Sequence, residues 1–154
     1  PWKSIQLPNA PSHNEYSSPV ILLNGSFSVG NPDFKNVPSV AANMLVKNVG
    51  YSQDEALAFH HIQRQGMEQL ADITNKLADR FPQAQFVYRP HPSERLETYH
   101  ELLEKRDNIH LIKKGEIQGW LRLASAVIMR GCTTAIEAGM AGVPSFSPMW
   151  LPMH

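Results

Sequence analysis

The stretch that decides the fold is SAVIMRGCTTAIEAGMAGVPSFS, residues 125–147. Its pattern predicts an apolar strand over 125–130, a turn at Gly131, a short helix that begins at two threonines, and another strand over 143–147. A helix between two apolar strands is typical of a parallel β-α-β unit, because parallel strands need a long crossover. The open question is whether Thr133, Thr134 and Glu137 only start the helix or also hold a ligand.

The same alternation of strand and helix extends over most of the chain. We expect the other strands at 19–24, 84–89 and 108–112, and the other helices at 53–80, 93–105 and 116–124. The expected strands are continuous apolar runs, which is typical of strands covered on both faces. The sequence therefore predicts an α/β fold, a doubly wound, Rossmann-like parallel sheet of about five strands.

The ends of the helices and the loops also leave signals. Ser52 and Glu55 fit a capping box at the start of the longest helix. The stretch 25–52 is rich in Gly, Pro and Asn, and we expect it to be a long loop. Residues 1–18 are rich in Pro, Ser and Asn and fit a linker or inter-domain segment. Residues 19–154 then form one domain, and the termini lead us to expect a fragment of a longer chain.

Composition excludes several classes of protein. The 154 residues carry 14 Lys and Arg against 14 Asp and Glu, so no net charge attracts nucleic acid or an anionic membrane. Hydrophobic residues make up 42% and charged residues 18%, which is typical of a globular protein. One cysteine, Cys132, allows no internal disulfide and fits a reducing cytoplasm. No transmembrane run occurs in these 154 residues, and no signal peptide is visible in them, although they begin with Pro1 rather than Met.

The usual nucleotide and metal motifs are missing. GSFSVGN, residues 25–31, has the glycine spacing of a P-loop, but Asn31 stands where a lysine must neutralise phosphate. The sequence has no G-x-G-x-x-G and no cluster of His, Cys and Asp with the spacing of metal ligands. We therefore expect neither a metal nor another cofactor.

The segment RPHPSE, residues 89–94, follows an expected strand. In parallel sheets, ligands bind outside the carboxyl ends of the strands. Arg89, His91 and the amides of the next helix could bind an anion there, with Ser93 as a candidate helix cap. Histidine is a common general acid, so His91 could protonate a leaving phosphate. The alternative is a histidine packed in an ordinary turn.

The segment RGCTT at 130–134 follows another expected strand in the same way. The first helical amides and the hydroxyls of Thr133 and Thr134 suit a phosphate, and Glu137 one turn later could accept bonds from ribose hydroxyls. The same residues also satisfy a second capping box, from Thr134 to Glu137. Spacing alone leaves both interpretations open.

Taken together, RPHPSE, NIHLI and GCTTAIEAGMAGVP resemble the C-terminal, donor-binding domain of GT-B glycosyltransferases. The resemblance is to bacterial surface-polysaccharide (capsule and lipopolysaccharide) biosynthesis proteins of the His-Pro-motif group. That group includes sialyl-, polysialyl- and Kdo-transferases and teichoic-acid polymerases. NGSFSVGN is similar to an N-x-x-F-x-x-x-N segment of these proteins. The resemblance covers about residues 19–150.

The resemblance implies roles for particular residues. His91 would be catalytic, contacting the donor's phosphate and assisting its departure, and Thr133 and Thr134 would hold the same phosphate. Glu137 would bind the ribose of the nucleotide. The loop at 113–116 (Lys113, Lys114, Gly115 and Glu116) would approach the base, and the segment with Asn24, Ser26 and Phe27 would face the acceptor.

The resemblance also implies partners. The nucleotide-activated donor, CMP- or CDP-linked in the His-Pro group, would be a substrate, and an N-terminal acceptor-binding domain would complete the cleft. The full-length protein could then associate peripherally with the inner membrane. Residues 1–154 alone would transfer nothing, because one domain cannot hold donor and acceptor together. Two alternatives stay open: a UDP-sugar 2-epimerase-like domain, and a non-catalytic Rossmann-like module.

Overall fold

The computed structural model describes residues 18–33 and 38–151. Its sheet has five parallel strands in the order β3-β2-β1-β4-β5, so the predicted α/β, Rossmann-like parallel sheet is confirmed. The strands are β1 (Val20–Asn24), β2 (Gln85–Arg89), β3 (Ile109–Leu111), β4 (Ala124–Met129) and β5 (Ser145–Phe146). The expected linker over 1–18 lies outside the described residues, apart from Ser18.

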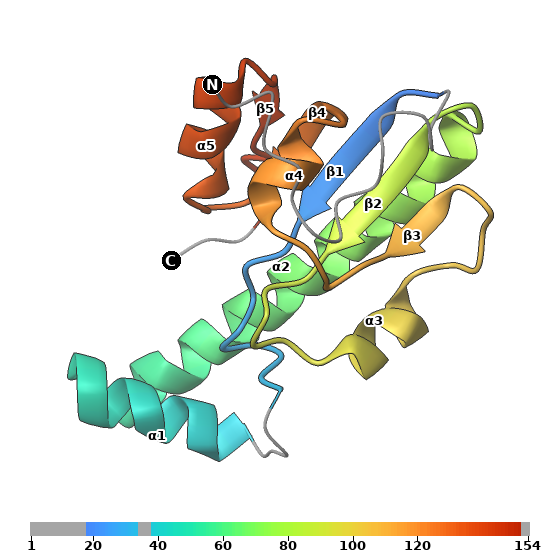
Figure 1. Cartoon of the computed structure of the whole chain (residues 1–154). Coiled ribbons are helices and arrows are strands. Elements are labelled where there is room, and N and C mark those ends of the chain that lie inside the picture. Colours follow the sequence, from blue (N-terminus) through green and yellow to red (C-terminus); the bar gives the residue numbers. More distant parts are fainter. Residues whose placement is uncertain (1–17, 34–37, 152–154) are drawn as a thin grey trace.

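Helices cover both faces of the sheet (Figure 1). They are α1 (Pro38–Val49), α2 (Gln53–Arg80), α3 (Leu96–Leu102), α4 (Ile117–Leu121) and α5 (Thr134–Ala141). One core cluster joins the sheet to α2 and α3, and a second joins its other face to α4 and α5. Helix α1 packs on the first part of α2, away from the sheet (Figure 1).

The central strand β1 shows how the two core clusters are divided. Its side chains alternate between the faces, as strand geometry requires. Leu23 lies in the α2–α3 cluster and Leu22 in the α4–α5 cluster, and neither has any exposed surface. An unbroken apolar run is therefore needed in this strand, and VILLN supplies it.

The strand order places a topological switch point between β1 and β4. From β1 the chain proceeds outward to β2 and then β3, and it returns to the other side of β1 for β4 and β5. Connections therefore leave the carboxyl ends of β1 and β4 in opposite directions, which opens a crevice between them. Asn24 ends β1 and is paired in register with Met129 at the end of β4. A ligand is expected at this position.

Two expectations about elements were wrong. Residues 38–49, expected to be part of a loop, form α1, whose first residue is Pro38. Proline suits this position because the first helical N–H has no partner within the helix. The helix expected at 93–105 is shorter, Leu96–Leu102, because the residues before it are held by other segments. By contrast, α2 begins and ends as predicted, with the capping box of Ser52 and Glu55.

Gly30 allows the loop after β1 to touch α2. A Cβ built at this position would lie 2.7 Å from the Arg64 nitrogen and 2.8 Å from the Gln63 carbonyl carbon. Both atoms belong to helical backbone and cannot move aside. We therefore expect Gly30→Ala to lower the free energy of unfolding by about 1 to 3 kcal/mol, measured by urea denaturation.

Gly139 in α5 is the matched control for this substitution. A Cβ there would meet no atom within 4 Å. Because alanine is the better helix former, Gly139→Ala should raise the free energy of unfolding by about 0.5 to 1 kcal/mol. Equal effects at the two positions would contradict the close approach of the loop to α2.

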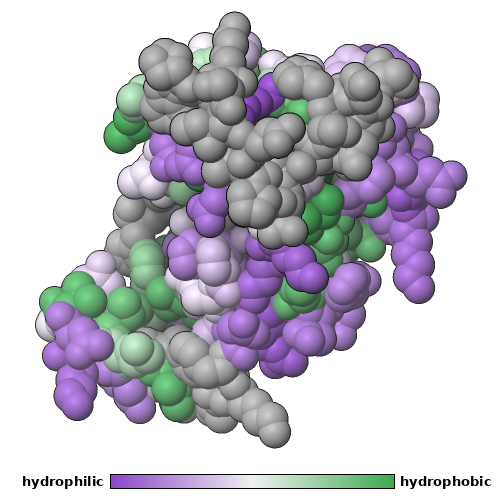
Figure 2. Space-filling view, in the orientation of Figure 1, coloured by the Kyte–Doolittle hydropathy of each residue, from purple (hydrophilic) through white to green (hydrophobic). Residues whose placement is uncertain are grey.

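The described surface is mixed, with some large apolar side chains exposed. Val40, Met44 and Val49 of α1 are 41%, 50% and 58% exposed, and Figure 2 shows apolar surface over α1 at the lower left. Across residues 18–33 and 38–151, no helix has both the length and the apolar character that a bilayer crossing requires.

Candidate ligand site at the carboxyl edge of the sheet

The residues at the switch point form a small polar cluster. The Nδ2 group of Asn24 donates to Thr134 Oγ1 at 3.1 Å and to Cys132 Sγ at 3.3 Å. Thr134 Oγ1 and Cys132 Sγ lie 3.2 Å apart. The end of β1 is thus joined to the segment after β4. Asn24, expected to face the acceptor, instead contacts the segment to which the donor's phosphate was assigned.

The turn after β4 has the shape that the sequence predicted. Gly131 has φ 61°, in the left-handed region that side chains with a Cβ rarely adopt. Helix α5 then begins at Thr134, with Thr133 as N-cap. The Thr133 side chain makes no capping hydrogen bond, and the Thr134 hydroxyl bonds to Asn24 and Cys132 instead. The capping-box alternative for Thr134 and Glu137 is therefore wrong.

The two threonines differ in what they can reach. Thr134 is only 6% exposed, whereas Thr133 is exposed. The amides of Ala135 and Ile136 bond back to the carbonyls of Cys132 and Thr133. Within the described residues, the N–H groups of Thr133 and Thr134 have no such acceptor. The α5 start therefore offers two amides and one exposed hydroxyl to an anion.

Glu137 lies one turn into α5 and is partly buried. Its Oε2 is shielded from solvent and has no hydrogen-bond partner among the described residues. A buried carboxylate oxygen without a donor is costly, so such groups are rare and call for an explanation. A ligand hydroxyl would satisfy it.

His91 lies on the neighbouring loop, beyond the end of β2, and is exposed. Its Nδ1 lies 2.6 Å from Ser93 Oγ and accepts a bond from the Ser93 amide at 3.2 Å. The neutral ring that accepts at Nδ1 carries its proton on Nε2, the nitrogen directed away from Ser93. Ser93 is therefore not the expected helix cap, because α3 begins only after Arg95. It orients the imidazole.

The buried carboxylate of Glu94 holds this loop in place, a role that the sequence analysis missed. Glu94 has no exposed surface, and its Oε1 accepts from the amides of Phe27 at 3.0 Å and His91 at 2.9 Å. The hydroxyl of Tyr99 donates to Oε2. Burial raises the pKa of Glu94, while the bonds from Tyr99, Phe27 and His91 partly offset that rise. The carboxylate thus ties the loops after β1 and β2 to α3.

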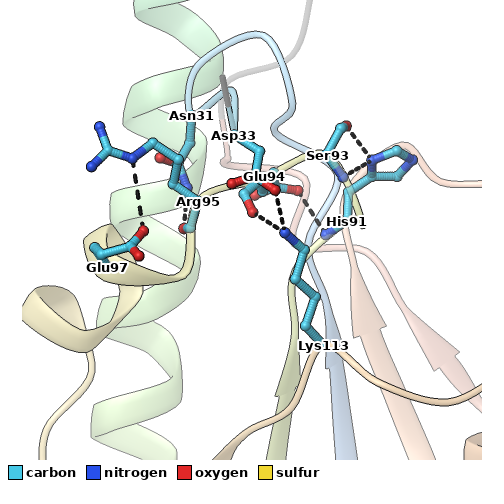
Figure 3. A network of polar contacts seen from close by, with 8 residues as sticks. All are labelled: Asn31, Asp33, His91, Ser93, Glu94, Arg95, Glu97 and Lys113. Carbon is cyan, nitrogen blue, oxygen red and sulfur yellow. Dashed lines mark hydrogen bonds and ion pairs between the residues drawn. The ribbon is translucent and has the colours of Figure 1, made fainter. Parts of the chain in front are cut away.

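Lys113, which follows β3, also supports the His91 loop through contacts with Glu94 and Asp33 (Figure 3). Its Nζ donates to the Glu94 carbonyl at 2.6 Å and to Asp33 Oδ2 at 2.9 Å. The amide of Asp33 in turn donates to the Ser93 carbonyl at 2.7 Å. The Lys113 side chain, expected near a nucleotide base, is therefore used to brace the His91 loop.

The rest of the expected base-binding loop is held by two residues of the core. Arg89 donates to the Gly115 carbonyl, and the Trp120 indole donates to the Lys114 carbonyl at 3.1 Å. Gly115 has φ 87°, so the loop turns sharply there. Glu116 is the N-cap residue of α4. Whether the loop meets a base stays a prediction.

Arg89 carries a buried charge at the end of β2. The residue is 8% exposed, and its guanidinium carbon lies 5.8 Å from the Trp120 ring centroid. Its Nε has no hydrogen-bond partner in the described part of the chain. Burial lowers the pKa of Arg89, and the charge of Glu116 opposes this shift. In register Arg89 stands beside Asn24. A buried guanidinium at this edge that forms no ion pair with a carboxylate among residues 18–33 and 38–151 is suited to an anionic ligand.

The N-x-x-F-x-x-x-N segment has a structural explanation. Phe27 is buried and its amide bonds to Glu94. Asn31 is buried as well, donating to the Arg95 carbonyl at 2.9 Å and accepting from Thr98 at 2.8 Å. Ser26, which directly precedes Phe27, is partly exposed. Apart from Asn24, this segment anchors the His91 loop, and its expected contact with an acceptor stays a prediction.

The chemistry available at this edge is therefore anion binding, hydroxyl recognition and proton transfer at His91. No group of three or more His, Cys, Asp or Glu side chains that could hold a metal ion occurs within 18–33 and 38–151. Comparison of the chain with protein-family models and with curated proteins finds no match.

Proposed function

We propose that this chain is the donor-nucleotide-binding half of a bacterial glycosyltransferase that acts in surface polysaccharide biosynthesis, with a CMP- or CDP-linked donor. The observation that supports the proposal best is the state of the Glu137 carboxylate, whose Oε2 has no hydrogen-bond partner among the described residues. Its buried, unpartnered oxygen lies beside a helix start whose threonines form no side-chain cap, at the switch point of a doubly wound sheet. A ribose hydroxyl is a suitable partner for such an oxygen.

In this proposal the phosphate of the donor lies at the start of α5. The hydroxyl of Thr133 and the first amides of the helix bind it, and the buried charge of Arg89 lies on the same face of the sheet. Thr134 stands behind them and does not reach the phosphate. His91, with the Nε2 proton turned away from Ser93, donates to the phosphate as the bond to the sugar breaks.

The proposal is tested by titrating the chain with CMP, CDP, UDP and ADP and following the amide chemical shifts. We expect the cytidine nucleotides to bind with a dissociation constant of about 10 μM to 1 mM, because half a cleft leaves the ligand partly in water. Shifts should concentrate at the residues after β2 and β4. A chain that binds none of the four nucleotides would refute the proposal, and a preference for UDP would favour the epimerase-like alternative.

Glu137→Gln is the variant that tests the ribose contact. Loss of the charge should weaken binding of the cytidine nucleotide by about 1 to 3 kcal/mol, the value of a hydrogen bond to a charged group. Thermal stability should change little, because Oε2 has no partner to lose. Glu97→Gln, the same change in the first turn of α3, is the control and should leave binding unchanged. Equal affinities of the parent and Glu137→Gln would contradict the ribose contact.

A further inference from the structure

Asn24 stands at the centre of the candidate site with both of its amide protons in use. A carboxamide nitrogen has two protons to donate. Here one is directed to Thr134 Oγ1 and the other to Cys132 Sγ. Thr134 is buried at the first position of α5, so the plane of the carboxamide is fixed by the helix start.

The carboxamide oxygen of Asn24 remains available to accept a hydrogen bond from a ligand. The side chain is only partly buried, and its Oδ1 accepts no hydrogen bond from any described residue. Within the described chain this oxygen is not one of the buried polar atoms that lack a partner, so it is open to solvent. Asn24 therefore presents an acceptor, and no donor, at the open edge of the sheet. A phosphate oxygen is itself an acceptor and cannot bond to it, whereas a hydroxyl can.

We propose that Asn24 is a specificity-determining residue that accepts a hydrogen bond from a hydroxyl group of the ligand. The inference rests on the proposed function and extends it, because it separates a hydroxyl-reading position from the phosphate-binding start of α5. The hydroxyl has two possible sources: the ribose of the nucleotide, or the sugar or polyol that the donor carries. Thr134 and Cys132 are positioning residues that keep the oxygen outward.

Two pairs of probes distinguish the sources. CMP and 2′-deoxy-CMP differ only in a ribose hydroxyl, and CDP-glycerol and CDP differ in the carried polyol. Isothermal titration of the parent should show a preference of about 3- to 10-fold for the hydroxylated member of one pair, the ratio expected for one neutral hydrogen bond. The pair that shows this preference identifies the source.

Asn24→Ala should abolish that preference while changing the affinity for the member without the hydroxyl by less than about 2-fold. Thr134→Val frees the carboxamide to rotate and should reduce the same preference, whereas Thr134→Ser keeps the hydroxyl and should retain it. Asn43→Ala, on the exposed side of α1, is the matched control and should behave as the parent.

The outcomes separate this inference from the proposed function. If the parent binds none of the four probes, the proposed function fails and the inference fails with it. If the parent binds but has no preference within either pair, or keeps its preference in Asn24→Ala, the proposed function survives and the inference alone is overturned. An equal loss of affinity for all four probes in Asn24→Ala would assign Asn24 a purely structural role and would also overturn it.

Discussion

Replacement of Glu94 by alanine should lower the free energy of unfolding by about 3 to 5 kcal/mol. The substitution removes the acceptor of three donors: the buried amide of Phe27, the partly buried amide of His91 and the buried hydroxyl of Tyr99. It also opens a cavity at a side chain that has no exposed surface. Urea denaturation followed by circular dichroism measures the effect.

Glu94→Gln is the variant that separates the hydrogen bonds from the charge. The glutamine oxygen can still accept from both amides. The neutral glutamine also carries no charge to bury, whereas burial raises the pKa of the glutamate. We expect a loss of about 1 kcal/mol or less. A glutamine variant as unstable as the alanine variant would contradict the role given to the two amide bonds.

Replacement of Arg89 by methionine should weaken binding of a cytidine diphosphate by about 10- to 100-fold, because a bond to a charged group is lost. The free energy of unfolding should stay within about 1 kcal/mol of the parent or rise. The reason is that, among the residues that the structure describes, the buried guanidinium bonds to the Gly115 carbonyl but its Nε has no partner. Methionine, in contrast, can pack on Trp120. Calorimetric titration and thermal melting measure both effects.

Arg95→Met is the control for this change, since Arg95 is an exposed arginine on the adjoining loop. It should bind nucleotide like the parent. If Arg89→Met instead unfolds easily and binds normally, the charge serves the fold and not an anion.

The sequence could predict what depends on neighbouring residues. The capping box of Ser52 and Glu55 spans one turn, so its letters determined the start of α2. The apolar run at 20–24 predicted a strand buried on both faces because burial on two sides leaves no polar alternation. Features of this local kind were enough to predict the fold class, whereas the strand order and the switch point came only from the structure.

What the sequence could not predict depends on contacts between distant segments. The shortened α3 follows from Glu94, whose carboxylate is satisfied by Phe27 and Tyr99 rather than by a helix start. Asn24 and Thr134 lie 110 positions apart, so no spacing pattern indicated that one fixes the other. The pattern T-x-x-E satisfies the local rule for a helix cap, but the hydroxyl of Thr134 instead bonds to Asn24 and Cys132, which lie outside the helix.

The position of β1 in the sheet has a consequence for how the chain folds. Every pairing in this sheet is parallel, and one flank of β1 is closed only by β4, late in the sequence. A ribosome therefore releases β1, β2 and β3 before the strand that covers this flank exists. Until then an apolar edge with unpaired backbone groups faces solvent, and such edges pair readily with other chains. Non-local closure of this kind slows folding, so a strand that lies in the middle of the native sheet has an exposed, aggregation-prone edge during synthesis.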